Sequence, residues 1–282
     1  MPFSHIAGND SVKSELTSLL PSLKGTTLLF SGPPGVGKLK MAKAIGAYLL
    51  NDKERVDKEN HPDLSLYCVE GKSRIHTAES IQKLIDTLQI PPFEASCRIA
   101  IVDAAERMPT TSSNRLLKSL EELEATWVVI LITTHPEKLL LTIVSRSRSI
   151  RFLPLKEEEL NAADPRIAYL AEGSLQKASL LGAPLQLQIW DHLKKLEESR
   201  LYHKRLLLIQ SIDQILTGVE EENLETEVDL LFDQLLYLHR GSPDLDARAD
   251  QIEHGRAAYK QHIKLKTILD WYYLLDNTIC GK

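Results

Sequence analysis

A glycine-rich segment, SGPPGVGKLK (31–40), has the residue types and spacing needed to hold a phosphate group. Its glycines are Gly32, Gly35 and Gly37. Glycines let the backbone curl so that its N–H groups face phosphate oxygens, and Lys38 adds a positive charge. The phosphate-binding signature continues with Ser or Thr, whose hydroxyl binds Mg²⁺, but this chain has Leu39. The segment therefore predicts a phosphate-binding loop with an impaired metal site.

A second candidate position follows the apolar run RIAIVD (98–103), which ends in Asp103. In enzymes that hydrolyse ATP on such a loop, an Asp at this place helps to hold magnesium. Many of them carry an acidic residue directly afterwards to polarise the attacking water, whereas this chain has Ala104. Glu106 comes two residues later and need not face the same site. The sequence therefore predicts that the chain does not hydrolyse ATP.

Two threonines, Thr133 and Thr134, end the next apolar run, WVVILITT. Polar residues at the carboxyl end of a strand in an open α/β sheet lie beside the ligand crevice. A threonine here could equally cap a helix expected over 136–142. Both interpretations stay open at this point.

Arg146 stands between two serines in TIVSRSRSIRF (142–152). It is either a surface residue in a salt bridge or a finger offered to ATP on another subunit. In the second case its guanidinium would stabilise charge on the phosphoryl group being transferred. Spacing alone favours the salt bridge.

These residues require a sheet to position them, and the first half of the chain alternates between strand and helix patterns. The predicted strands are 26–31, 64–69, 98–103, 127–133 and 149–152. The predicted helices between them are 37–50, 76–89, 112–123 and 136–142. This alternation predicts a parallel α/β sheet. Beyond Pro154 the pattern favours helix only, with long amphipathic runs over 186–217, 224–239 and 244–276.

Composition narrows the class of protein. The chain has 282 residues and a net charge of −5, which argues against a strong stand-alone nucleic-acid binder. It has no run of 18 apolar residues and no secretory pattern at its start, and its three cysteines are widely spaced. We therefore expect a cytoplasmic protein with no membrane partner and no metal centre.

Three ordered motifs resemble the AAA+ clamp-loader family of bacterial DNA polymerase III. They are HPDL (61–64), RIAIVDAAERMPTTSSNRLLKSLEE (98–122) and TTHPEKLLLTIVSRSRSIRF (133–152). SHIAGNDSVKSEL (4–16) is similar to the family's opening segment, which borders the nucleotide base. The resemblance covers residues 4 to about 185 and implies three domains. They are an AAA+ α/β domain with a degenerate P-loop over 1–152, a small helical lid over 153–185 and a helical collar for oligomerisation over 186–282.

The resemblance also assigns roles to residues. The family pattern is Ser-Arg-Cys, in which the arginine acts in trans on a neighbour's ATP, and here it reads Ser145-Arg146-Ser147. It implies a catalytic role in trans for Arg146 and a degenerate nucleotide site that binds ATP weakly or not at all. The residues of that site are Gly32, Gly35, Gly37, Lys38, Asp103 and Thr134. The resemblance also shows two differences from the gamma/tau-type subunits, which hydrolyse ATP. Those subunits carry a four-cysteine zinc module, but residues 51–63 of this chain contain no cysteine. They also carry an arginine in the helical lid, and this chain has Gln176 at that place.

The resulting hypothesis is a non-hydrolysing subunit of the clamp loader, within the DNA polymerase III holoenzyme, that needs no cofactor. Its partners would be the gamma/tau and delta subunits, with the sliding clamp and primed DNA reached through the complex. One alternative is an active gamma/tau-type ATPase in which Glu106 or a water replaces the missing groups. Another is a free-standing P-loop enzyme such as a small-molecule kinase.

Overall fold

The structure is a computed structural model that describes residues 3, 5–69, 75–160, 164–199, 201–240, 242 and 245–275. The chain divides into two compact units. The first contains Met1–Asn161 and Gly173–Leu175, and the second contains Ala162–Glu172 and Gln176–Lys282. In the described part of the chain, no helix is both long enough and apolar enough to cross a membrane.

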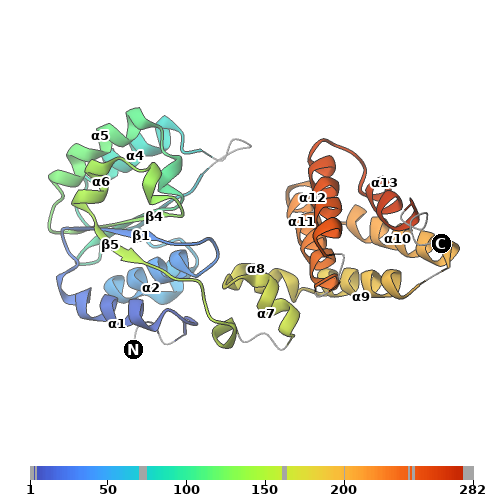
Figure 1. Cartoon of the computed structure of the whole chain (residues 1–282). Helices are drawn as coiled ribbons and strands as arrows, with labels where there is room; N and C mark the ends of the chain where they lie inside the picture. The colour runs from blue at the N-terminus through green and yellow to red at the C-terminus, as the bar shows by residue number, and fades with distance from the viewer. Residues whose placement is uncertain are drawn as a thin grey trace. The chain divides into compact units, whose positions relative to one another are not determined.

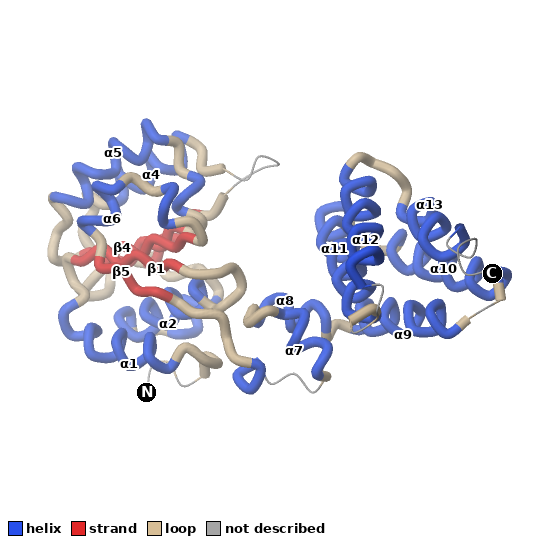
Figure 2. Tube along the Cα trace, in the orientation of Figure 1, coloured by secondary structure: helices blue, strands red, loops and turns tan. Residues whose placement is uncertain are grey.

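The first unit is built on a parallel sheet with strand order β2-β3-β4-β1-β5. Figure 2 shows the strands side by side between helices. The strands are β1 (Thr26–Ser31), β2 (Leu64–Tyr67), β3 (Arg98–Val102), β4 (Trp127–Thr133) and β5 (Arg148–Arg151). They lie within a few residues of the predicted ranges, so the predicted α/β class is confirmed.

Helices cover both faces of this sheet (Figure 1). One face carries α1 (Asp10–Leu19) and α2 (Lys38–Leu50), and the other carries α4 (Ala78–Thr87), α5 (Thr110–Glu121) and α6 (Leu141–Arg146). A short helix, α3 (Lys53–Asp57), contacts α2. Within β1, Leu28 and Phe30 pack toward α1 and α2 while Leu29 packs toward the opposite layer. Because both faces of β1, β3 and β4 are buried, these three strands are continuous apolar runs in the sequence.

The prediction of a helix over 136–142 is wrong. Residues Pro136–Lys138 form a single 3₁₀ turn, and α6 begins at Leu141 and continues to Arg146. Buried Leu139 and Ile143 pack into the core on the α4–α6 side of the sheet. This packing decides where the helix lies, because the local sequence is compatible with both placements.

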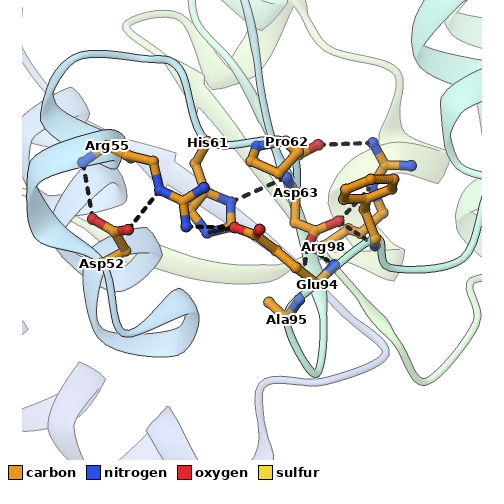
Figure 3. Close-up of polar contacts among 9 residues, drawn as sticks. Asp52, Arg55, His61, Pro62, Asp63, Glu94, Ala95 and Arg98 are labelled. Atoms are coloured by element: carbon orange, nitrogen blue, oxygen red, sulfur yellow. Dashed lines mark hydrogen bonds and ion pairs between the residues drawn. The ribbon is translucent and has the colours of Figure 1, made fainter.

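The loop before β3 is fixed by a buried carboxylate (Figure 3). Asp63 is fully buried and accepts hydrogen bonds from the backbone N–H groups of Phe93, Glu94 and Ala95 at 2.6, 2.9 and 2.9 Å. Arg98 Nε lies 3.6 Å from Asp63 Oδ1. Burial disfavours the charge, but the three N–H groups and Arg98 outweigh it and lower the pKa of Asp63. The HPDL motif therefore contributes an anchor for this loop.

The second unit is helical in its described residues and has its own core. Its helices are α7 (Pro165–Ala171), α8 (Leu175–Leu181), α9 (Pro184–Glu198), α10 (Tyr202–Thr217), α11 (Glu221–Leu238), α12 (Leu245–Lys260) and α13 (Leu265–Asp270), followed by a π-helical turn over Trp271–Leu275. The predicted runs over 186–217 and 244–276 are therefore not continuous helices. The proposed lid and collar boundaries remain predictions.

Candidate nucleotide site and surface arginine

Three adjacent strands bring most of the predicted site residues to one edge of the sheet. The glycine loop follows β1, Asp103 follows β3 and Thr134 follows β4. Because β3, β4 and β1 are neighbours and run parallel, their carboxyl ends lie together. The predicted cluster is therefore assembled by the topology of the sheet.

The glycine loop has the conformation that its sequence predicts. Gly32, Gly35 and Gly37 have φ angles of 146°, 74° and 94°. A Cβ atom on Gly32 would lie 2.4 Å from the backbone oxygen of Phe152, so a side chain has no room there. Gly37 is the N-cap residue of α2, and its carbonyl accepts from Met41 N at 2.9 Å.

Lys38 is bound by its own loop. Its Nζ donates to the carbonyl oxygens of Gly32 and Pro33 at 2.6 and 2.5 Å. Only 6% of Lys38 is exposed, and this burial lowers its pKa to about 8 although the charges of Asp103 and Glu106 act in the opposite direction. A bound phosphate would have to compete with these two carbonyls for the ammonium group.

Leu39 has no ligand to offer a metal ion. Its side chain is partly buried and packs against the core formed by α1, α2 and one face of the sheet. Apolar packing thus replaces the Ser or Thr hydroxyl that would bind Mg²⁺. Among the described residues, no group of three or more His, Cys, Asp and Glu side chains could hold a metal ion.

Asp103 lies in a tightly bonded turn. Its Oδ1 accepts from the N–H of Ala104 at 3.0 Å, and Ala104 has a φ of 51°. The buried His76 donates from Nε2 to the main-chain oxygen of Asp103 at 2.7 Å. No sequence motif marks His76, which precedes α4. The turn is held by side chains on two separate segments.

Glu106 faces the same site, which the sequence left undecided. Its Oε1 accepts from Thr134 Oγ1 at 2.8 Å, and its charge acts on Lys38. Burial opposes its ionisation, but hydrogen bonds from Thr133 and Thr134 outweigh that effect and lower its pKa. Glu106 Oε2 is buried and has no hydrogen-bond partner. The 3₁₀ turn Ala105–Arg107 therefore brings a carboxylate back to the edge of the sheet.

Neither threonine caps the 3₁₀ turn that follows β4. The N-cap residue of that turn is His135, which makes no side-chain cap. Thr133 Oγ1 instead accepts from His135 N at 3.0 Å, while Thr134 bonds to Glu106. The helix-cap interpretation is thus wrong. Thr134 lies beside Glu106, at the carboxyl ends of the strands where the glycine loop and Asp103 also lie.

Arg146 lies on the surface as the last residue of α6. Its Nη2 is 2.5 Å from Glu121 Oε1, and its Nη1 donates to the backbone oxygen of Thr142 at 3.2 Å. The Arg146 and Glu121 side chains are 39% and 46% exposed. The guanidinium is therefore accessible although it already has an acidic partner.

The chain is similar in sequence to subunits of DNA polymerase III and of replication factor C. Residues 12–156 match the model of a family described as DNA polymerase III, delta subunit. The chain is 32% identical over 144 residues to the DNA polymerase III subunit delta' of Bacillus subtilis, covering 47% of this chain and 43% of that protein. It is 29% identical over 192 residues to a replication factor C small subunit of Methanococcus maripaludis, covering 62% and 58%. The chain thus spans about half the length of these relatives.

A solved structure extends the likeness in fold over nearly the whole chain. A DNA polymerase III gamma subunit-related protein from Thermotoga maritima superposes with a TM-score of 0.57 at 17% sequence identity. The superposition covers 93% of this chain and 97% of that protein. At this identity the likeness concerns the fold alone.

Proposed function

Because the chain belongs to the family described as DNA polymerase III, delta subunit, we propose that it is a delta-prime-type clamp-loader subunit that hydrolyses no ATP. In this role it helps to load the sliding clamp on primed DNA and offers Arg146 to ATP on a neighbouring subunit. Its direct partners are gamma/tau-type and delta subunits, and it reaches the clamp and DNA through the complex. The role implies a cytoplasmic chain.

The observation that carries this proposal is the packing of Leu39. At the position where a hydroxyl would hold magnesium, an apolar side chain packs against the core. Ala104 occupies the usual position of the catalytic base, and Lys38 is bonded to its own loop. A site with these three features can accept a phosphate weakly but lacks the groups that drive hydrolysis. Arg146 has a role that does not depend on them.

The proposal assigns one task to each predicted part of the chain. The AAA+ domain over 1–152 carries the degenerate site and Arg146, the lid over 153–185 follows, and the collar over 186–282 carries oligomerisation. Gln176 in the lid supplies no charge to a nucleotide. These boundaries and tasks are part of the proposal.

The test measures ATP turnover in the isolated chain and in the reconstituted clamp loader. We expect no metal-dependent turnover from the isolated chain, and a lower turnover in the complex when Arg146→Ala replaces the wild-type subunit. Gel filtration must show equal assembly for the two complexes. Turnover by the isolated chain on the order of 1 s⁻¹ that Lys38→Ala abolishes would contradict the proposal.

The position of Glu106 favours a second candidate, an active gamma/tau-type ATPase. Its unpartnered Oε2 lies in the site and could orient an attacking water in place of the missing base. The same turnover assay separates the two candidates. An active enzyme would lose its turnover in Glu106→Gln, which keeps the size of the side chain and removes its basicity.

A further inference from the structure

From the contacts at the end of α6, we infer that Glu121 is a positioning residue for Arg146. Its carboxylate holds the guanidinium in the orientation in which a neighbouring subunit's nucleotide phosphate meets it. This inference rests on the proposed role of Arg146 in trans. It adds a second residue, on another helix, to that function.

The two side chains are carried by backbones that the core fixes. Glu121 ends α5, whose Leu116 and Leu120 are buried, and Arg146 ends α6, whose Ile143 is fully buried. All three apolar residues belong to one core cluster. The distance between the two attachment points is therefore set by packing, and the ion pair forms on a rigid base.

The contacts hold the guanidinium at two places without exhausting its donors. Arg146 Nη2 lies 2.5 Å from Glu121 Oε1, and Nη1 donates a hydrogen bond to the Thr142 carbonyl oxygen at 3.2 Å. A guanidinium has five N–H donors, so three remain for phosphate oxygens. A side chain that is already oriented loses less freedom when it binds, and small errors in the position of a catalytic group are costly. The pair therefore favours a preorganised finger.

Stability gives little reason for this ion pair. Exposed salt bridges contribute little to folding because solvent screens them and long side chains lose freedom. Removing Glu121 should therefore leave the fold and the assembly unchanged. An effect on catalysis can then be assigned to the orientation of Arg146.

The experiment uses the reconstituted clamp loader with Glu121→Ala, Glu121→Gln, Arg146→Ala or the double variant in this subunit. Glu122→Ala is the control, because it removes the same charge one residue further along. We expect Glu121→Ala to lower kcat toward the value of the Arg146→Ala complex, with a loss of roughly tenfold at the affected interface and KM unchanged. The double variant should equal Arg146→Ala, and Glu121→Gln, which keeps an acceptor oxygen, should be intermediate.

The outcomes separate this inference from the proposed function. If Arg146→Ala lowers kcat while Glu121→Ala matches wild type or exceeds it, Glu121 does not position the finger and only this inference fails. If Arg146→Ala itself has no effect in a fully assembled complex, both fail. A fall in kcat with Glu122→Ala equal to that with Glu121→Ala would also overturn the inference, since the cause would then be a general change in charge.

Discussion

At the scale of single residues, Lys38 is a buried cation, and its burial costs folding free energy. Burial lowers its pKa to about 8, while its two carbonyl partners and the charges of Asp103 and Glu106 offset only part of that cost. Buried groups with shifted pKa values concentrate at binding and catalytic sites. The charged form of this ammonium group therefore lowers the stability of the fold relative to its neutral form.

The pH dependence of stability tests the burial of Lys38. The folded-state pKa lies below the unfolded value of 10.5, so between pH 8 and 10.5 the unfolded chain binds more protons and stability rises with pH. Relative to Lys38→Met, wild-type chain should gain up to about 3 kcal/mol across this window. Urea unfolding at a series of pH values measures the difference, with Lys40→Met at an exposed position as the control. Parallel curves for wild type and Lys38→Met would show that the lysine is not buried.

At the scale of elements, Asp63 links two strands through a loop. It precedes β2, and it binds the N–H groups of the loop that leads into β3. In the same network, His61 Nε2 lies 3.2 Å from Glu94 Oε1, and Arg55 also pairs with Glu94 (Figure 3). The loop is thus held by buried Asp63 and, through Glu94, by buried His61 and partly exposed Arg55.

Asp63→Asn should therefore destabilise the protein by about 2–4 kcal/mol, because an amide group would place N–H donors against backbone donors in a buried site. Asp52→Asn is the matched control, since Asn also serves as an N-cap of α3, and it should cost less than about 1 kcal/mol. The stabilisation from Asp63 is present above its unfolded pKa of 3.8 and is lost as pH falls through its lower folded pKa. The loss of stability in acid should therefore be smaller in Asp63→Asn. Equal costs for the two variants in chemical unfolding would contradict this account.

At the scale of the whole molecule, the two units have separate cores. The clusters around the sheet and the cluster among the helices of the second unit share no residue. Separate cores allow separate loss of structure, because each unit buries its own apolar surface.

Hydrogen exchange can test this independence. Leu231→Ala removes a fully buried side chain from the second core and should cost about 2–5 kcal/mol there. Amides of α9 and α11 should exchange faster, while those of β3 and β4 keep their protection. Ile130→Ala in the first core should give the reverse pattern. Equal loss of protection in both units for either variant would show one cooperative structure.

The sequence by itself determined the sheet and the order of its parts. Unbroken apolar runs predicted β1, β3 and β4, because strands buried on both faces carry that signal. The alternation of strand and helix patterns predicted the less buried β2 and β5. The glycine loop, the missing metal ligand at Leu39 and the missing base at Ala104 could be seen without a structure, since each depends on residue type at a fixed spacing.

Only the tertiary structure decided which side chains meet. It placed Glu106 against Thr134, bound Lys38 to its own loop and paired Arg146 with Glu121. The pairs Glu106–Thr134 and Arg146–Glu121 join residues on different elements, so no local pattern encodes them. Packing between elements also determines that α6 begins at Leu141 and not at Pro136. In this arrangement Leu139 and Ile143 are both buried in the core. Local spacing determines elements, whereas the packing of those elements determines contacts.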